Sequence, residues 1–99
     1  MTRNENLLVT LMEECAEVQQ ATSITIRFGA SNYNPATPEM TNEQEVLTEY
    51  YQLVAVMEMI IERGIFTQLS SCDIEKIKLG KKDKVKHYET ISGRLGCVT

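Results

Sequence analysis

Apolar residues in the first 28 positions recur at the spacing of an α-helix. On a wheel of about 100° per residue they cover one broad arc. Its members are Leu7, Leu8, Leu11, Cys15, Val18 and Ile26. Thr2 or Asn4 can cap the start of this helix, and Gly29 suits its end. The pattern predicts a helix over about residues 5–27 whose apolar arc faces a core, with Cys15 as a small core residue.

A second helix is predicted after a loop over residues 30–41, which is rich in Ser, Asn and Pro. The residues Thr41-Asn42-Glu43-Gln44 resemble a capping box, and Gly64 follows the expected end at about Arg63. The apolar arc of this helix is wider than one neighbouring helix covers, which indicates burial by a second subunit as well. The arc consists of Val46, Leu47, Tyr50, Leu53, Val54, Met57, Ile60 and Ile61.

The remainder of the chain predicts two shorter, lysine-rich helices, over residues 73–78 and 81–92. Gly80 separates them and Gly93 ends the second. No strand pattern reaches a convincing length. The expected fold is therefore all-α, an antiparallel helical bundle of two long and one or two shorter helices. A hairpin this small has little core, so we expect assembly as a homodimer or homotetramer.

Composition narrows the class of protein. Hydrophobic residues make up 42% and charged residues 24% of the 99 positions, as in ordinary globular domains. The chain begins Met-Thr-Arg-Asn-Glu-Asn and has no apolar run of membrane-spanning length, so we expect no membrane partner. The three cysteines, Cys15, Cys72 and Cys97, form no CxxC pair. Their number and spacing favour the reducing cytoplasm over a disulfide framework or a zinc site.

Charge is distributed unevenly along the chain. Residues 1–71 carry 3 basic and 10 acidic side chains, a net charge of −7, whereas residues 72–99 carry 7 basic and 4 acidic ones, a net charge of +3. The acidic part argues against a nucleic-acid partner. An acidic site beside a lysine-rich tail is consistent with binding of a metal ion together with phosphate groups. The alternative, that the basic tail is simply solvated, is equally open.

Carboxylates gather at one place on the first predicted helix. Glu14 and Glu17 lie one turn apart at the rim of the apolar arc, and Glu13 lies farther toward solvent. Glu45, Glu49 and Gln52 follow the rim of the second helix. If the helices pack antiparallel, the two rims meet and can bind a hard cation such as Mg²⁺. Acidic pairs at this spacing are also common on solvated helices, so spacing alone leaves both interpretations open.

The order of sequence blocks adds to this picture. Residues 12–21 read MEECAEVQQA, residues 26–29 read IRFG, and residues 49–56 read EYYQLVAV. Residues 84–88 read KVKHY and residues 92–96 read SGRLG. In this order the blocks resemble a small MazG-like protein, of the compact type found in phages and bacteria. The resemblance covers nearly the whole chain and implies a single MazG-like all-α domain over residues 1–99.

The resemblance implies a cytoplasmic, oligomeric, Mg²⁺-dependent nucleoside triphosphate pyrophosphohydrolase, with Mn²⁺ as an alternative cofactor. It would convert an NTP or dNTP and water to the monophosphate and pyrophosphate. The family pattern is ExxE on one helix and ExxD on the next. It therefore implies metal binding by Glu14, Glu17, Glu49 and Gln52, with Glu13 or Glu17 as the base. Substrate contacts are expected from Arg27, Asn32, Asn34, Lys84, Tyr88 and Arg94.

Gln52 departs from that pattern, because the family has Asp at this position. A glutamine carbonyl oxygen can bind a hard cation, but it brings no charge. Two further hypotheses therefore stand beside hydrolysis. The chain could bind or sequester a nucleotide without turnover, or it could be a purely structural helical interaction module.

Overall fold

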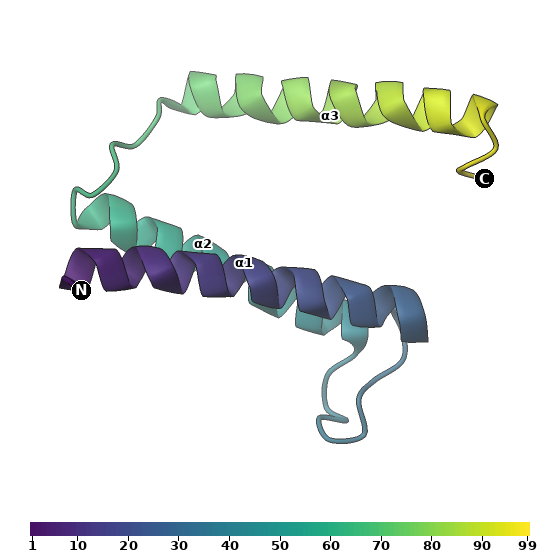
Figure 1. Cartoon of the computed structure of the whole chain (residues 1–99), viewed down its shortest axis with the longest axis horizontal. Helices are drawn as coiled ribbons and strands as arrows, with labels where there is room; N and C mark the ends of the chain where they lie inside the picture. Colours follow the sequence, from purple (N-terminus) through teal and green to yellow (C-terminus); the bar gives the residue numbers. More distant parts are fainter. The chain divides into compact units, whose positions relative to one another are not determined.

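The computed structural model describes all of residues 1–99 and contains three helices and no strand (Figure 1). Helix α1 spans Arg3–Phe28, α2 spans Asn42–Glu62 and α3 spans Ser71–Arg94. The all-α prediction is confirmed. The expectation of shorter C-terminal helices is wrong, because α3 has 24 residues and α2 has 21. None of the three helices combines the length and apolar character needed to cross a membrane.

Side-chain caps fix the starts of α1 and α2. The Thr2 hydroxyl accepts a hydrogen bond from the Glu5 backbone N–H at 3.1 Å, and the Glu5 carboxylate accepts one from the Thr2 N–H. Thr41 and Gln44 form the same reciprocal pair at the start of α2, which confirms the predicted capping box. Gly29 ends α1 with a φ of +93°, a conformation that favours glycine.

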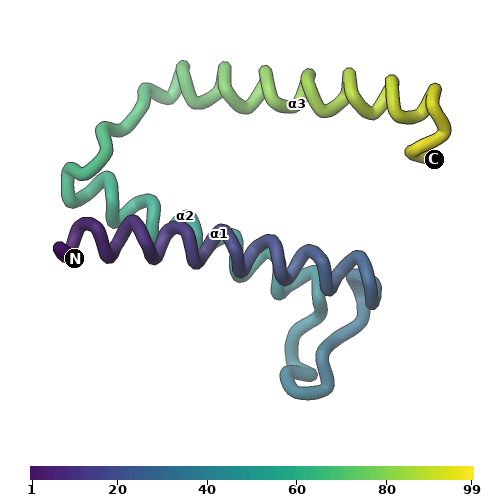
Figure 2. Tube along the Cα trace, in the orientation of Figure 1, coloured from purple at the N-terminus to yellow at the C-terminus, as the bar shows by residue number.

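Helices α1 and α2 run antiparallel and lie side by side, and the loop between them protrudes at one end (Figure 2). The base of this loop is closed around Asn42, which is only 4% exposed. The Asn42 side-chain amide donates to the Gly29 carbonyl at 2.9 Å, and its backbone N–H donates to the Asn32 carbonyl at 2.7 Å. One buried amide thus joins the end of α1 to the start of α2 and positions the loop between them.

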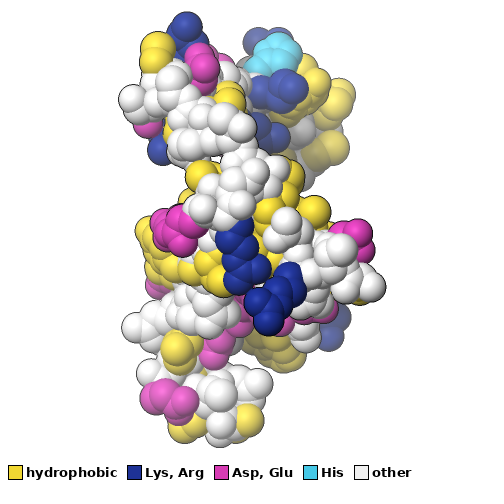
Figure 3. Space-filling model, turned by 90° about the vertical axis from the view of Figure 1, so that its left-hand side faces the viewer, with side chains coloured by type: hydrophobic (Ala, Val, Ile, Leu, Met, Phe, Trp, Pro, Cys, Tyr) yellow, Lys and Arg dark blue, Asp and Glu magenta, His cyan; other side chains and the backbone are white.

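The core of this hairpin is small, since Leu7 and Ile60 are its only buried apolar residues and only Ile60 is fully buried. Cys15 is exposed and Ile26 is 82% exposed, so their predicted burial is wrong. Both lie about 80–100° around α1 from Leu7, and the stripe that packs on α2 is narrower than the predicted arc. Apolar side chains remain at the surface (yellow in Figure 3). On α2 they include Leu47, Tyr50, Tyr51 and Met59.

Helix α3 is continuous, whereas the sequence pattern predicted a break at Gly80 and an end at Gly93. A single glycine costs a helix only about 1 kcal/mol relative to alanine. The hydroxyl of Ser70 caps the helix by accepting from the Asp73 N–H at 3.1 Å. No residue of α3 is fully buried. By their contacts, residues 1–67 form one compact unit and residues 68–99 form a second.

Candidate functional site

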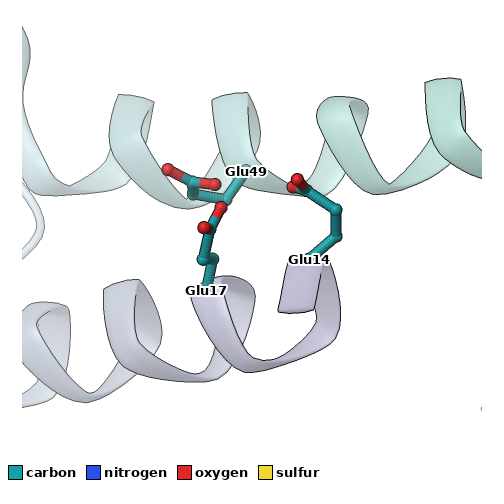
Figure 4. A group of neighbouring side chains, drawn as sticks. All are labelled: Glu14, Glu17 and Glu49. Atoms are coloured by element: carbon teal, nitrogen blue, oxygen red, sulfur yellow. The ribbon is translucent and has the colours of Figure 1, made fainter. Parts of the chain in front are cut away.

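Three glutamates from the two packed helices converge at the centre of the hairpin (Figure 4). Glu14 and Glu17 extend from successive turns of α1 toward α2, and Glu49 comes from α2. One carboxylate oxygen from each residue lies within 4.8 Å of the others. The antiparallel packing therefore brings together the two acidic rims that the sequence predicted, and we call these residues the carboxylate cluster.

Glu14 lies deeper than its predicted place at the rim of the apolar arc. It follows Leu7 by two turns and so lies within about 20° of that buried residue around the helix. Its carboxylate is partly buried, as is that of Glu49, whereas Glu17 is exposed. The Oε2 atoms of Glu14 and Glu49 are buried and accept no hydrogen bond. Burial without a partner is costly for an ionised carboxylate oxygen, and either protonation or a bound cation would offset that cost.

Within residues 1–67, no lysine or arginine forms an ion pair with the carboxylate cluster. The one ion pair of the chain joins Lys78 to Glu75 at 3.4 Å, and both residues belong to α3. Burial raises the pKa of the Glu14 carboxyl above its usual range, and the neighbouring charge of Glu17 raises it further. Burial likewise raises the pKa of Glu49, followed by the effects of Glu17, Glu14 and Glu45. The fold thus holds like charges together, which a divalent cation would relieve.

These raised pKa values predict how stability depends on pH when no metal is present. Between the ordinary glutamate pKa of 4.5 and the raised values, the folded protein binds more protons than the unfolded chain. The contribution of Glu14 and Glu49 to stability is therefore fully present below pH 4.5 and is lost as the pH rises through the raised values. We expect the melting temperature of Glu49→Gln, measured in EDTA, to fall less between about pH 5 and about pH 8 than that of the parent.

Glu58→Gln is the matched control for this measurement, because Glu58 is an exposed glutamate on the same helix and lies outside the carboxylate cluster. Its melting temperature should follow the parent across the pH range. If the melting temperature falls equally with pH in Glu49→Gln, Glu58→Gln and the parent, the cluster does not couple protonation to folding.

A cavity of about 390 Å³ leads from the carboxylate cluster toward the loop. Glu17 and Glu49 line one end of it together with Glu45, and we call it the acidic cavity. Its other lining residues are Gln20, Ala21, Ile24, Asn34, Thr37 and Asn42. Because the cavity is bounded by both helices and by the loop, a ligand that fills it would contact both the carboxylates and the loop.

A second cavity, of about 380 Å³, adjoins the first and shares Ile24, Asn34 and Asn42 with it. We call it the aromatic cavity, because Phe28 and Tyr33 line it. Asn32 and Pro35 complete its lining. The sequence pattern predicted no role for either aromatic residue, nor for Gln20 and Thr37 of the acidic cavity. The signal that could have identified the two rings is their position in the sequence, close to the loop asparagines.

The other predicted site residues lie in several places. Asn32 and Asn34 line the cavities. Glu13 and Arg27 are exposed on α1, and Glu13 lies outside the carboxylate cluster. Gln52 is exposed on α2 and lines a separate depression with Leu47, Thr48, Tyr51 and Ala55.

The three remaining predicted substrate residues, Lys84, Tyr88 and Arg94, are exposed on α3 in the second unit. Their roles stay predictions.

Comparison of the chain with protein-family models, with curated proteins and with solved structures found no match.

Proposed function

We propose that this chain is a divalent-cation-dependent nucleoside triphosphate pyrophosphohydrolase of the small MazG-like type. The observation that carries the proposal is the carboxylate cluster, in which Glu14 and Glu49 each bury an oxygen atom without a hydrogen-bond partner. The sequence order of the two blocks, Glu14-x-x-Glu17 followed by Glu49-x-x-Gln52, supports the same assignment. A cavity that opens from the cluster offers space for the phosphates of a substrate.

The donor set suits Mg²⁺, with Mn²⁺ as the alternative, since both prefer carboxylate oxygens. Glu14, Glu17 and Glu49 would hold the ion. When bound, it supplies positive charge against the charge that develops on the phosphates during hydrolysis. The raised pKa values of Glu14 and Glu49 have burial as their main cause and neighbouring carboxylates as a further one. Cation binding is therefore expected to favour their ionised forms.

In the proposed reaction, the bond between the α- and β-phosphates breaks and the oxygen of water forms the new bond to phosphorus. The products are a nucleoside monophosphate and pyrophosphate. A carboxylate takes the proton of the attacking water. Of the two candidates from the sequence, Glu17 is favoured over Glu13, because Glu17 is exposed within the cluster and lines the acidic cavity. Within residues 1–67, Arg27 is the proposed phosphate contact.

We further propose that the chain acts as a homodimer or homotetramer. The hairpin buries only two apolar residues, and Tyr51 and Leu47 on α2 are 64% and 51% exposed. Removing such side chains from water would stabilise an assembly by about 25 cal/mol per Å² of apolar surface. A second copy of the chain is therefore proposed to cover this face of α2.

Product analysis tests the proposed activity. The common ribo- and deoxyribonucleoside triphosphates are incubated with the protein and Mg²⁺ or Mn²⁺, and products are separated by ion-exchange chromatography. We expect equal amounts of monophosphate and pyrophosphate from at least one nucleotide, and none in EDTA. Release of diphosphate and inorganic phosphate instead would contradict the proposed bond cleavage.

The exposed position of Gln52 favours one alternative, a protein that binds a nucleotide without hydrolysing it. Only three carboxylates converge at the cluster, and Gln52 lines a different depression. The same panel distinguishes the two functions. A binder would yield no product, yet its melting temperature would rise with nucleotide concentration, because a ligand that binds only the folded state stabilises it.

A further inference from the structure

We propose that the aromatic cavity binds the base of the nucleotide, while the carboxylate cluster and its cation hold the phosphates. This inference rests on the proposed function and assigns the part of the substrate that the cluster does not contact. The two cavities share Ile24, Asn34 and Asn42, so one extended ligand can reach from Glu49 to Phe28. The loop that bears Asn34 is fixed at its base by the buried Asn42. This contact fixes the position of one cavity relative to the other.

The two rings that line this cavity are accessible to a ligand. Phe28 and Tyr33 are each 57% exposed, although both are large aromatic side chains. Phe28 lies in the last turn of α1 and Tyr33 in the loop, so the rings approach the cavity from two different segments. Stacking of a base on an aromatic side chain is worth about 5- to 150-fold in affinity. It tolerates any base, because every base has an aromatic face.

Asparagine side chains add polar groups that can contact the edge of a base. The Asn32 amide nitrogen donates to the Phe28 carbonyl, which leaves its Oδ1 atom free to accept. The Asn34 Oδ1 atom accepts from the Ala36 backbone N–H at 2.9 Å, which leaves its amide nitrogen free to donate. One free acceptor and one free donor therefore lie beside the two rings. This combination matches a heteroaromatic base, which carries both kinds of group at its edge.

Binding measurements on two probes test this assignment. One probe is the nucleoside triphosphate that the unaltered protein binds most tightly, and the other is inorganic triphosphate, which has no base. Calorimetry is performed with Ca²⁺ in place of Mg²⁺. We expect Phe28→Ala and Tyr33→Ala each to weaken nucleotide binding by about tenfold and to leave inorganic triphosphate unchanged. Phe28→Tyr keeps a ring at this position and should bind the nucleotide as the parent does.

Phe66→Ala is the matched control, because Phe66 is also exposed, at 44%, but lines neither cavity. Its affinity for both probes should equal that of the parent. Unchanged nucleotide affinity in Phe28→Ala and Tyr33→Ala would overturn the base assignment, as would an equal loss for both probes. In both cases the proposed function would stand if the parent still releases pyrophosphate. If the parent neither binds nor hydrolyses any nucleotide, the proposed function itself fails.

Discussion

Replacing Glu14 by glutamine is expected to lower the rate of Mg²⁺-dependent hydrolysis by about 100-fold or more. Residues that merely orient a metal ligand are worth roughly 10- to 100-fold in affinity or activity, so a direct ligand should be worth at least as much. Glutamine keeps the size of the side chain but removes one of three converging charges. Initial rates of pyrophosphate release at saturating nucleotide, over a range of Mg²⁺ concentrations, measure the effect.

The stability of the same variant should change in the opposite direction. Burial and the nearby Glu17 charge raise the pKa of Glu14, so its ionised form is disfavoured in the folded protein. In EDTA near neutral pH, Glu14→Gln should therefore melt at a higher temperature than the parent. A variant that is more stable and less active has lost a ligand, because unfolding would lower both quantities.

Glu58→Gln provides the control for general effects of removing a glutamate, since Glu58 is exposed and lies outside the carboxylate cluster. It should retain the parent's rate and Mg²⁺ dependence. Full activity in Glu14→Gln would refute the assignment of the metal site to this cluster.

The local signals in the sequence predicted most of the first two helices. Thr41 and Gln44 form the expected capping box, and Gly29 ends α1 as its position suggested. These features depend on contacts between residues only a few positions apart, which a sequence displays directly. The continuous α3 shows the limit of this reasoning. A glycine lowers helix propensity by a fixed small amount, and the residues on both sides of Gly80 favour the helix enough to compensate.

Depth within the fold was harder to predict than spacing. The periodicity placed Cys15 in the core and Glu14 at the rim, whereas Cys15 is exposed and Glu14 is partly buried. Whether each of these residues is buried depends on which side of α1 faces α2. That side is set by side-chain packing along both helices. The aromatic cavity was not predicted for a similar reason. Its lining combines the end of α1 with a loop whose path is fixed by long-range contacts of Asn42.

Replacing Gln52 by aspartate is expected to raise either the affinity for Mg²⁺ or the rate of hydrolysis by about tenfold. The physical reason is the added negative charge one turn from Glu49, which attracts a cation at the carboxylate cluster, although the exposure of this position weakens that attraction. Gln52 follows Glu49 by one turn of α2. Because the helices are antiparallel and Thr25 on α1 contacts Asn42 on α2, Gln52 lies at about the level of Glu14.

The effect of charge at this position is separated from that of length by a second variant, Gln52→Asn. Asparagine has the length of aspartate and remains neutral, so it should bind Mg²⁺ no more tightly than the parent. The Mg²⁺ concentration for half-maximal activity is measured for all three proteins, or the Mg²⁺-induced rise in melting temperature if no turnover is found. A gain confined to Gln52→Asp would mean that a carboxylate here completes the set formed by Glu14, Glu17 and Glu49. If neither affinity nor rate changes, the exposed Gln52 side chain takes no part in the site, and three carboxylates must hold the cation alone.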